Sequence, residues 1–60
     1  MTKRRDIVRE LQAAGFVQVP GFNGSHDKFS NGRLTVPVLR HREIPEGTIR
    51  KIRHDAGLSR

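Results

Sequence analysis

Cysteine and long apolar runs are both missing from this 60-residue sequence. Without cysteine, neither a disulfide nor a thiolate metal site can stabilise the fold or take part in catalysis. A reducing, cytoplasmic setting is consistent with that absence. Because the longest apolar runs are two or three residues, we expect no membrane-spanning segment, and no signal-peptide core follows Met1. Structure and function must therefore come from a small core and from polar side chains.

The length of the chain predicts a single domain, spanning residues 1–60. A domain of this size buries about 60% of the surface that its unfolded chain exposes, so its core is thin. Leu, Ile, Val and Phe nevertheless make up 16 of the 60 residues, above the roughly one-fifth level below which a charged chain is usually disordered. The composition therefore predicts a folded protein.

Positive charge dominates the polar residues. Twelve Lys and Arg oppose six Asp and Glu, which leaves a net charge of +6, and nine of the twelve cations are Arg. The planar guanidinium group suits phosphate, and domains with a pI above about 9 commonly bind nucleic acid. Since the cations recur along the whole chain, we rank nucleic acid ahead of docking to an acidic protein and ahead of simple solubility. Composition alone does not separate an enzyme from a binding module.

Two helices are predicted near the ends of the chain. The first runs from about Thr2 to Ala14, and Gly15 provides a left-handed stop. Its apolar face consists of Ile7, Val8, Leu11 and Ala14. The second begins between Pro45 and Thr48 and ends at Ala56. Its apolar stripe consists of Ile49, Ile52 and Ala56.

One feature of the first helix conflicts with its predicted start. Lys3, Arg4 and Arg5 would occupy the first turn, where each cation opposes the helix macrodipole by about 0.3–1 kcal/mol at low salt. Either the helix starts later, or an anionic partner holds these charges in place.

Three strands are predicted between the helices. Phe16–Val19 is short and ends at Pro20-Gly21. The segments 25–30 and 33–38 form a hairpin, because Asn31-Gly32 is the preferred sequence for a two-residue type I′ turn. The resulting order, α-β-β-β-α, predicts an α+β fold with a three-stranded antiparallel sheet. Both helices cover one face of that sheet and leave the other open for a ligand.

The hairpin turn also sets a register, with Ser30 opposite Arg33 and His26 opposite Pro37. Alternation then separates a core face from a solvent face. The core face carries Phe29, Leu34, Val36 and Val38, and the solvent face carries His26, Lys28, Arg33 and Thr35. Asp27 falls on the apolar face, so it must lie at the end of the sheet or be turned out by a bulge.

His26 is the strongest candidate for chemistry, because histidine is the only side chain whose unperturbed pKa allows proton exchange near neutral pH. In RNA the 2′-hydroxyl can attack the adjacent phosphate without metal or cofactor. A positioned histidine contributes about 10²- to 10⁴-fold through proton transfer. Lys28, two residues along the same strand face, suits stabilisation of charge on the phosphoryl oxygens.

Further residues are candidates for binding RNA. Gly24 would let the backbone approach the substrate, and the Ser25 amide or hydroxyl could hold a phosphate oxygen. Arg33 on the open face and His41 in a basic loop could also contact phosphate. The alternative is that all of these are ordinary surface residues, since a lone surface histidine is more often inert than catalytic.

No metal or cofactor is expected, because the histidines lack metal-ligand spacing and no cysteine assists them.

Several short motifs together resemble the HicA-type toxins of bacterial and archaeal toxin-antitoxin systems. They run over nearly the whole chain, at 11–16, 24–26, 35–37, 47–50 and 56–59. The segments read LQAAGF, GSH, TVP, GTIR and AGLS. None is specific alone, and the resemblance depends on their joint order and spacing.

The resemblance implies a double-stranded-RNA-binding-domain-like fold, cleavage of messenger RNA that blocks translation, and neutralisation by a HicB-type antitoxin. The family's catalytic histidine lies in its Gly-Ser-His motif and corresponds to His26. Two positions depart from the family pattern. Leu39 stands where members often have a histidine, with His41 two residues on. Asp27 places a carboxylate directly after the motif histidine, where it would repel phosphate if it faced the substrate.

Two non-enzymatic alternatives remain open. Folds of this type usually recognise RNA by shape, 2′-hydroxyls and phosphates without any chemistry, so a non-catalytic RNA-binding module is the first. A basic partner for an acidic protein is the second. Fold alone does not decide among the three.

Overall fold

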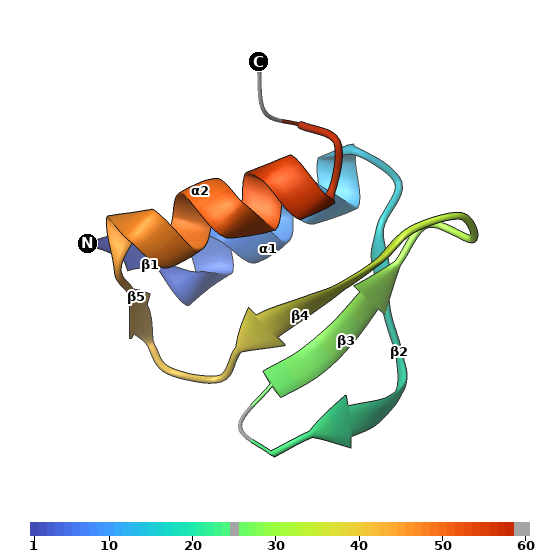
Figure 1. Cartoon of the computed structure of the whole chain (residues 1–60), viewed down its shortest axis with the longest axis horizontal. Coiled ribbons are helices and arrows are strands. Elements are labelled where there is room, and N and C mark those ends of the chain that lie inside the picture. Colours follow the sequence, from blue (N-terminus) through green and yellow to red (C-terminus); the bar gives the residue numbers. More distant parts are fainter. Residues whose placement is uncertain (25, 59–60) are drawn as a thin grey trace.

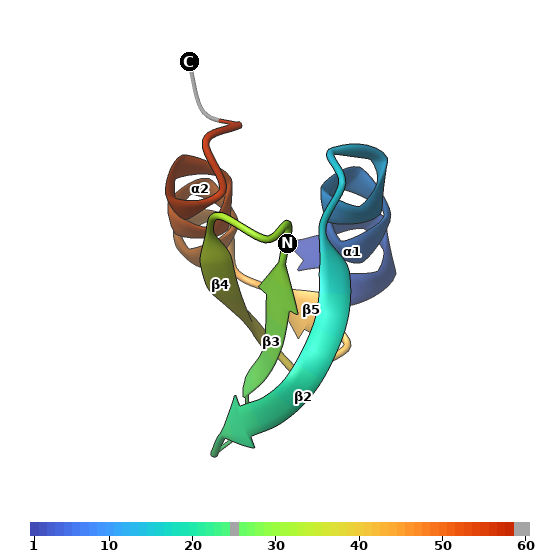
Figure 2. The same cartoon turned by 90° about the vertical axis from the view of Figure 1, so that its right-hand side faces the viewer.

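Two helices pack over one side of a small antiparallel sheet in the computed structural model, which describes residues 1–24 and 26–58 (Figures 1 and 2). The elements in order are β1 (Thr2–Lys3), α1 (Arg4–Ala13), β2 (Val17–Asn23), β3 (His26–Ser30), β4 (Thr35–Leu39), β5 (Glu43–Ile44) and α2 (Glu46–Asp55). The main sheet has the order β2-β3-β4, and β1 pairs with β5 in a separate ladder. The predicted α+β architecture is confirmed, with the β1–β5 ladder as an addition. Neither helix is long and apolar enough to cross a membrane.

The core lies between the helices and the covered face of the sheet. Its buried members are Ile7, Leu11, Phe16, Phe29, Val36, Val38, Ile44, Ile49, Ile52 and Ala56. The spacing of three or four residues within each helix places its apolar side chains on one stripe. The sheet contributes through alternate residues, as a half-covered strand requires.

Both helices end in the same way, with a glycine in the left-handed conformation. After α1, the Phe16 amide donates to the Leu11 carbonyl at 2.9 Å, while Gly15 has φ +92°. After α2, the Leu58 amide donates to the Arg53 carbonyl at 2.8 Å, and Gly57 has φ +75°. These bonds satisfy carbonyls left open at a helix end, and the left-handed glycine turns the next side chain back toward the core. The predicted stop at Gly15 is confirmed.

The first helix starts later than Thr2, which is one of the two alternatives that its basic first turn left open, whereas the predicted end of the first strand was wrong. The first helix starts at Arg4, because Thr2 and Lys3 pair with Ile44 and Glu43, and the Arg4 amide donates to the Arg42 carbonyl at 2.8 Å. Strand β2 does not end at Pro20-Gly21 but continues to Asn23. Its pairing with β3 shifts between Val19 and Phe22, where Gly21 adopts φ +98°. An irregularity on an edge strand tolerates a proline that a regular central strand would not.

The hairpin register also differs from the prediction. Ser30 lies opposite Thr35, and His26 lies opposite Leu39, so the connection spans residues 31–34. The Asn31 side chain explains the longer loop, because its Oδ1 accepts from the amides of Arg33 at 2.9 Å and Leu34 at 2.7 Å. The slip is two residues, so each strand residue keeps its predicted face. Leu34 leaves the predicted core face of the hairpin and is exposed in the loop, and Ala14 of the predicted apolar helix face is exposed as well.

Strand β1, which the sequence did not predict, is also joined to α2 by a side-chain hydrogen bond that can be tested. Thr2 Oγ1 donates to Glu46 Oε2 at 2.6 Å, which holds the pKa of Glu46 below its ordinary value of 4.5. The stability linked to this shift is present above the ordinary pKa and is lost as pH falls through the folded-state pKa. We expect Thr2→Ala to raise the pKa of Glu46 toward the ordinary value, as measured by NMR titration of its carboxyl carbon. Thr2→Ser keeps the hydroxyl and should keep the low pKa; an unchanged value in Thr2→Ala would contradict the hydrogen bond.

Candidate active site and nucleic-acid interface

His26 is the first residue of β3 and lies on the strand face opposite the buried Asp27 and Phe29. Its side chain is half-buried rather than enclosed in the core. In the sheet it pairs with Asn23 of β2 and Leu39 of β4, so two neighbouring strands fix its backbone. The imidazole is therefore presented at the surface by a rigid element, as proton transfer to a bound ligand requires.

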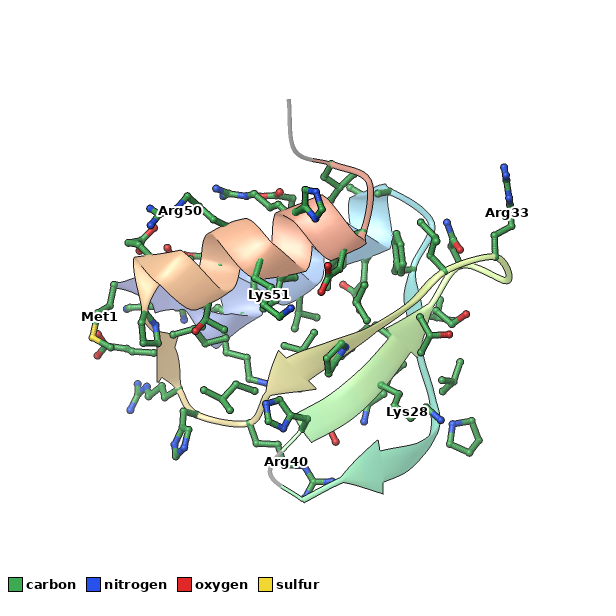
Figure 3. The ribbon with its side chains drawn as sticks, in the orientation of Figure 1. Met1, Lys28, Arg33, Arg40, Arg50 and Lys51 are labelled. Atoms are coloured by element: carbon green, nitrogen blue, oxygen red, sulfur yellow. The ribbon has the colours of Figure 1, made fainter. Side chains whose placement is uncertain are left out.

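A groove connects His26 with the second helix. We call it the α2 groove; its volume is about 70 Å³ and its lining consists of His26, Pro37, Leu39, Thr48, Lys51, Ile52 and Asp55. The strand residues supply an apolar wall, and the helix supplies a hydroxyl, an ammonium group and a carboxylate. Lys51 Nζ lies 3.7 Å from Asp55 Oδ2 in an exposed pair. An imidazole thus shares a small groove with an ammonium group. Figure 3 shows Lys51 projecting from α2 beside β4.

Lys28, predicted to be the stabilising cation, is exposed on the same strand face as His26. Its side chain extends over the irregularity in β2: a Cβ built on Gly21 would lie 3.6 Å from Lys28 Nζ. This direction leads away from α2 (Figure 3). Lys51 therefore lines the groove together with His26, whereas Lys28 points away from the groove toward β2.

The Gly-Ser segment before His26 is only partly described. Gly24 is exposed with φ +62°, and a Cβ there would meet no atom within 4 Å. Glycine is needed here for the left-handed backbone rather than for lack of space. Ser25, the predicted phosphate ligand, lies outside the described residues.

The other two predicted RNA contacts lie away from the α2 groove. Arg33 is in the hairpin loop at the opposite end of β3 from His26, and its side chain points outward (Figure 3). His41 is exposed in the connection between β4 and β5, between Arg40 and Arg42. The structure does not bring Arg33 together with His26, because the strand separates them. His41 follows Leu39, the strand partner of His26, by two residues.

Asp27 turns away from the open face and does not oppose a phosphate there. Its residue exposure is 8%, and it lies at the end of the sheet, as one of the two sequence-based alternatives required. Asp27 Oδ2 accepts from Arg4 Nη2 at 2.8 Å, and Oδ1 accepts from Arg40 Nε at 2.9 Å. Arg4 Nε also donates to the Leu39 carbonyl at 3.0 Å. These bonds join the start of α1 to the strand ends around His26.

The contribution of α2 to the groove was missed in the sequence. The prediction for this helix covers only its apolar stripe, yet Thr48, Lys51 and Asp55 share one face at spacings of three and four residues. That polar stripe beside the apolar stripe was a usable signal. The sequence does not reveal that β4 and His26 lie against it, because this contact depends on how α2 packs on the sheet.

A metal site is not formed by the described part of the chain. Within residues 1–24 and 26–58, no three His, Asp or Glu side chains are grouped closely enough to hold an ion.

Comparison with known proteins found one matching family and one similar solved structure. The family model described as the HicA toxin of bacterial toxin-antitoxin matches residues 4–58. A solved chain from a toxin-antitoxin complex of Streptococcus pneumoniae is similar, with 34% sequence identity and a TM-score of 0.81. The match covers 97% of this chain and 100% of that one. A search of curated proteins returned no match.

Proposed function

The chain belongs to the HicA toxin family of bacterial toxin-antitoxin systems, and from that premise we propose that it is a metal-independent endoribonuclease acting on messenger RNA. The observation that supports this most is the α2 groove, where the half-buried His26 imidazole and the Lys51 ammonium group share one small space. Cleavage of messages would block translation. Since messenger RNA is the substrate, we place the activity in the cytoplasm.

In the proposed reaction, the 2′-oxygen of the substrate forms a bond to the neighbouring phosphorus, and the bond from phosphorus to the 5′-oxygen breaks. His26 accepts the proton from the 2′-hydroxyl. The imidazolium so formed returns a proton to the departing 5′-oxygen, directly or through water. The products are a 2′,3′-cyclic phosphate and a free 5′-hydroxyl. The reaction requires no oxidant, metal or cofactor.

Charge on the phosphoryl oxygens increases as the new bond forms, and fixed cations nearby stabilise it. We assign this role to Lys51 in the α2 groove and to Lys28 on the same strand face as His26. Gly24 and Ser25 lie just before the histidine, where their backbone could approach the same phosphate. Asp27 is a positioning residue, because its bonds to Arg4 and Arg40 hold the strand end that carries His26.

Control of the toxin is proposed to come from a HicB-type antitoxin protein. The similar solved chain was determined in a toxin-antitoxin complex. A net charge of +6 favours a partner with an acidic contact surface. Such a partner would need to cover the α2 groove to prevent cleavage.

The test is a cleavage assay in EDTA with two single strands of the same base sequence, one RNA and one DNA. We expect the RNA to be cut, leaving cyclic-phosphate and 5′-hydroxyl ends identified by mass spectrometry. The DNA should stay intact, because it lacks the 2′-hydroxyl nucleophile. Cleavage of both strands would contradict the mechanism. RNA binding without any cleavage would favour the non-catalytic module, which has the same fold and charge.

A further inference from the structure

A second cavity lies outside the α2 groove and is lined only by cations. It has a volume of about 230 Å³, and its lining consists of Lys3, Arg4, Arg5 and Arg42. We call it the basic hollow. Its residues come from β1, the start of α1 and the residue before β5, which the Arg4 amide and the Arg42 carbonyl join at 2.8 Å. The volume is below the roughly 300–1,000 Å³ of pockets that enclose drug-sized ligands, so it suits a phosphate group better than a whole nucleotide.

The charge of the basic hollow is largely uncompensated. Arg4 is neutralised by Asp27, but Lys3, Arg5 and Arg42 form no ion pair with any carboxylate of residues 1–24 or 26–58. Glu43 lies opposite Lys3 in the β1–β5 ladder and still makes no ion pair with it in this part of the chain. Like charges held around one cavity repel each other, and an anion bound there would relieve that repulsion.

One hydrogen bond links the lining of the basic hollow to the lining of the α2 groove. Leu39 lines the groove, and its carbonyl accepts from Nε of Arg4, which lines the hollow. The chain then runs from Leu39 through Arg40 and His41 to Arg42. This segment therefore connects the strand partner of His26 with the basic hollow, and Figure 3 shows Arg40 at the end of the sheet.

From this placement we infer that the basic hollow binds a backbone phosphate of the RNA, one that flanks the phosphate cleaved at His26. This inference rests on the proposed function. The hollow would fix the path of the strand across the protein, while the α2 groove acts on the bond to be broken. Such phosphate contacts position a nucleic acid without reading its sequence.

The experiment measures binding on a His26→Ala background, so that cleavage plays no part. Arg5→Gln with Arg42→Gln removes two exposed charges from the hollow. Arg9→Gln with Arg50→Gln removes the same charge from exposed positions on α1 and α2 that line neither cavity, and is the matched control. The probe is a single-stranded RNA of about 12 nucleotides, within the ~4–16-nucleotide footprints of small single-strand-binding domains.

We expect the hollow variant to bind this RNA about tenfold more weakly than the control at low salt, as loss of a charged hydrogen bond predicts. The slope of log affinity against log salt should fall by about 0.7, the value for one single-strand phosphate contact. Equal affinity and slope in both variants would overturn the inference while leaving the nuclease proposal intact. If the parent His26→Ala protein binds no RNA, both the inference about the hollow and the nuclease proposal are contradicted. A loss confined to antitoxin binding would assign the hollow to protein docking and also overturn the inference.

Discussion

Replacing His26 with alanine should lower the rate of RNA cleavage by about 10²- to 10⁴-fold, the usual contribution of a positioned proton-transfer group. The loss should appear in kcat, because the imidazole acts on the reacting atoms rather than on the distant backbone. RNA affinity should change little, since Lys28, Lys51 and the basic hollow remain. The measurement is single-turnover cleavage of a labelled RNA in EDTA, with binding measured separately on an uncleavable 2′-deoxy analogue.

His54→Ala is the matched control for this substitution. His54 lies near the end of α2, where its side chain is 81% exposed, and it lines neither cavity. The control should cleave at the parental rate and unfold at the parental temperature. Equal cleavage by the His26 and His54 variants would remove His26 from the mechanism. In cells, growth arrest on expression should likewise be relieved by the first substitution and not by the second.

The second large effect concerns stability. Asp27→Ala should lower the free energy of unfolding by about 2–3 kcal/mol, because it leaves two guanidinium groups without their shared carboxylate. Removing one partner of a fully buried ion pair costs about 3–5 kcal/mol. The smaller figure allows for water around Arg4 and Arg40, whose side chains are 26% and 49% exposed. The unfolding temperature should fall by roughly 10–20 °C, since about 1 kcal/mol corresponds to 4–8 °C in a domain of this size. Thermal and urea unfolding followed by circular dichroism would measure both.

Two comparisons separate this effect from a general loss of charge. Glu10→Ala breaks the more exposed pair with Arg53, whose N–O distances are 2.9 and 3.1 Å, and should cost only about 0.5–1 kcal/mol. Arg40→Gln keeps the bond between Arg4 and Asp27 and should also cost about 1 kcal/mol or less. If Asp27→Ala proves no more harmful than Glu10→Ala, the carboxylate does not organise this end of the sheet. The Arg40 variant supplies a folded protein for comparison even if Asp27→Ala does not fold.

Local signals predicted most of the fold. The glycine at each helix end stops the helix through contacts with residues close to it in the sequence. The apolar spacing within each helix determines which side is buried. Strand alternation placed Phe29 on the core side and His26 on the other, although the hairpin register was wrong. That error was harmless for the site, because the slip was two residues and the pleat repeats every two.

Contacts between distant segments could not be read from local patterns. Strand β1 has only two residues, and they pair with residues of β5 that lie 40 and 42 positions further along the chain. The partners of Asp27 lie 23 and 13 residues away in the sequence. Without knowledge of these partners, a carboxylate on the apolar strand face contradicts the alternating pattern, although in the structure it joins α1 to the end of the sheet. The α2 groove likewise exists only after the second helix packs beside β4. Each of these features arises from tertiary packing, and each helps to position His26 or the cations near it.

The two-residue period of the hairpin has a consequence for how this segment can vary. A register shift of one residue between β3 and β4 would turn Val36 and Val38 toward water and Pro37 and Leu39 toward the core. Pro37 and Leu39 would then no longer line the α2 groove. A shift of two residues leaves both faces as they are. A single-residue insertion or deletion within β3 or β4 should therefore disrupt the core, whereas one within the loop at residues 31–34 should be tolerated because it leaves the strand pairing unchanged.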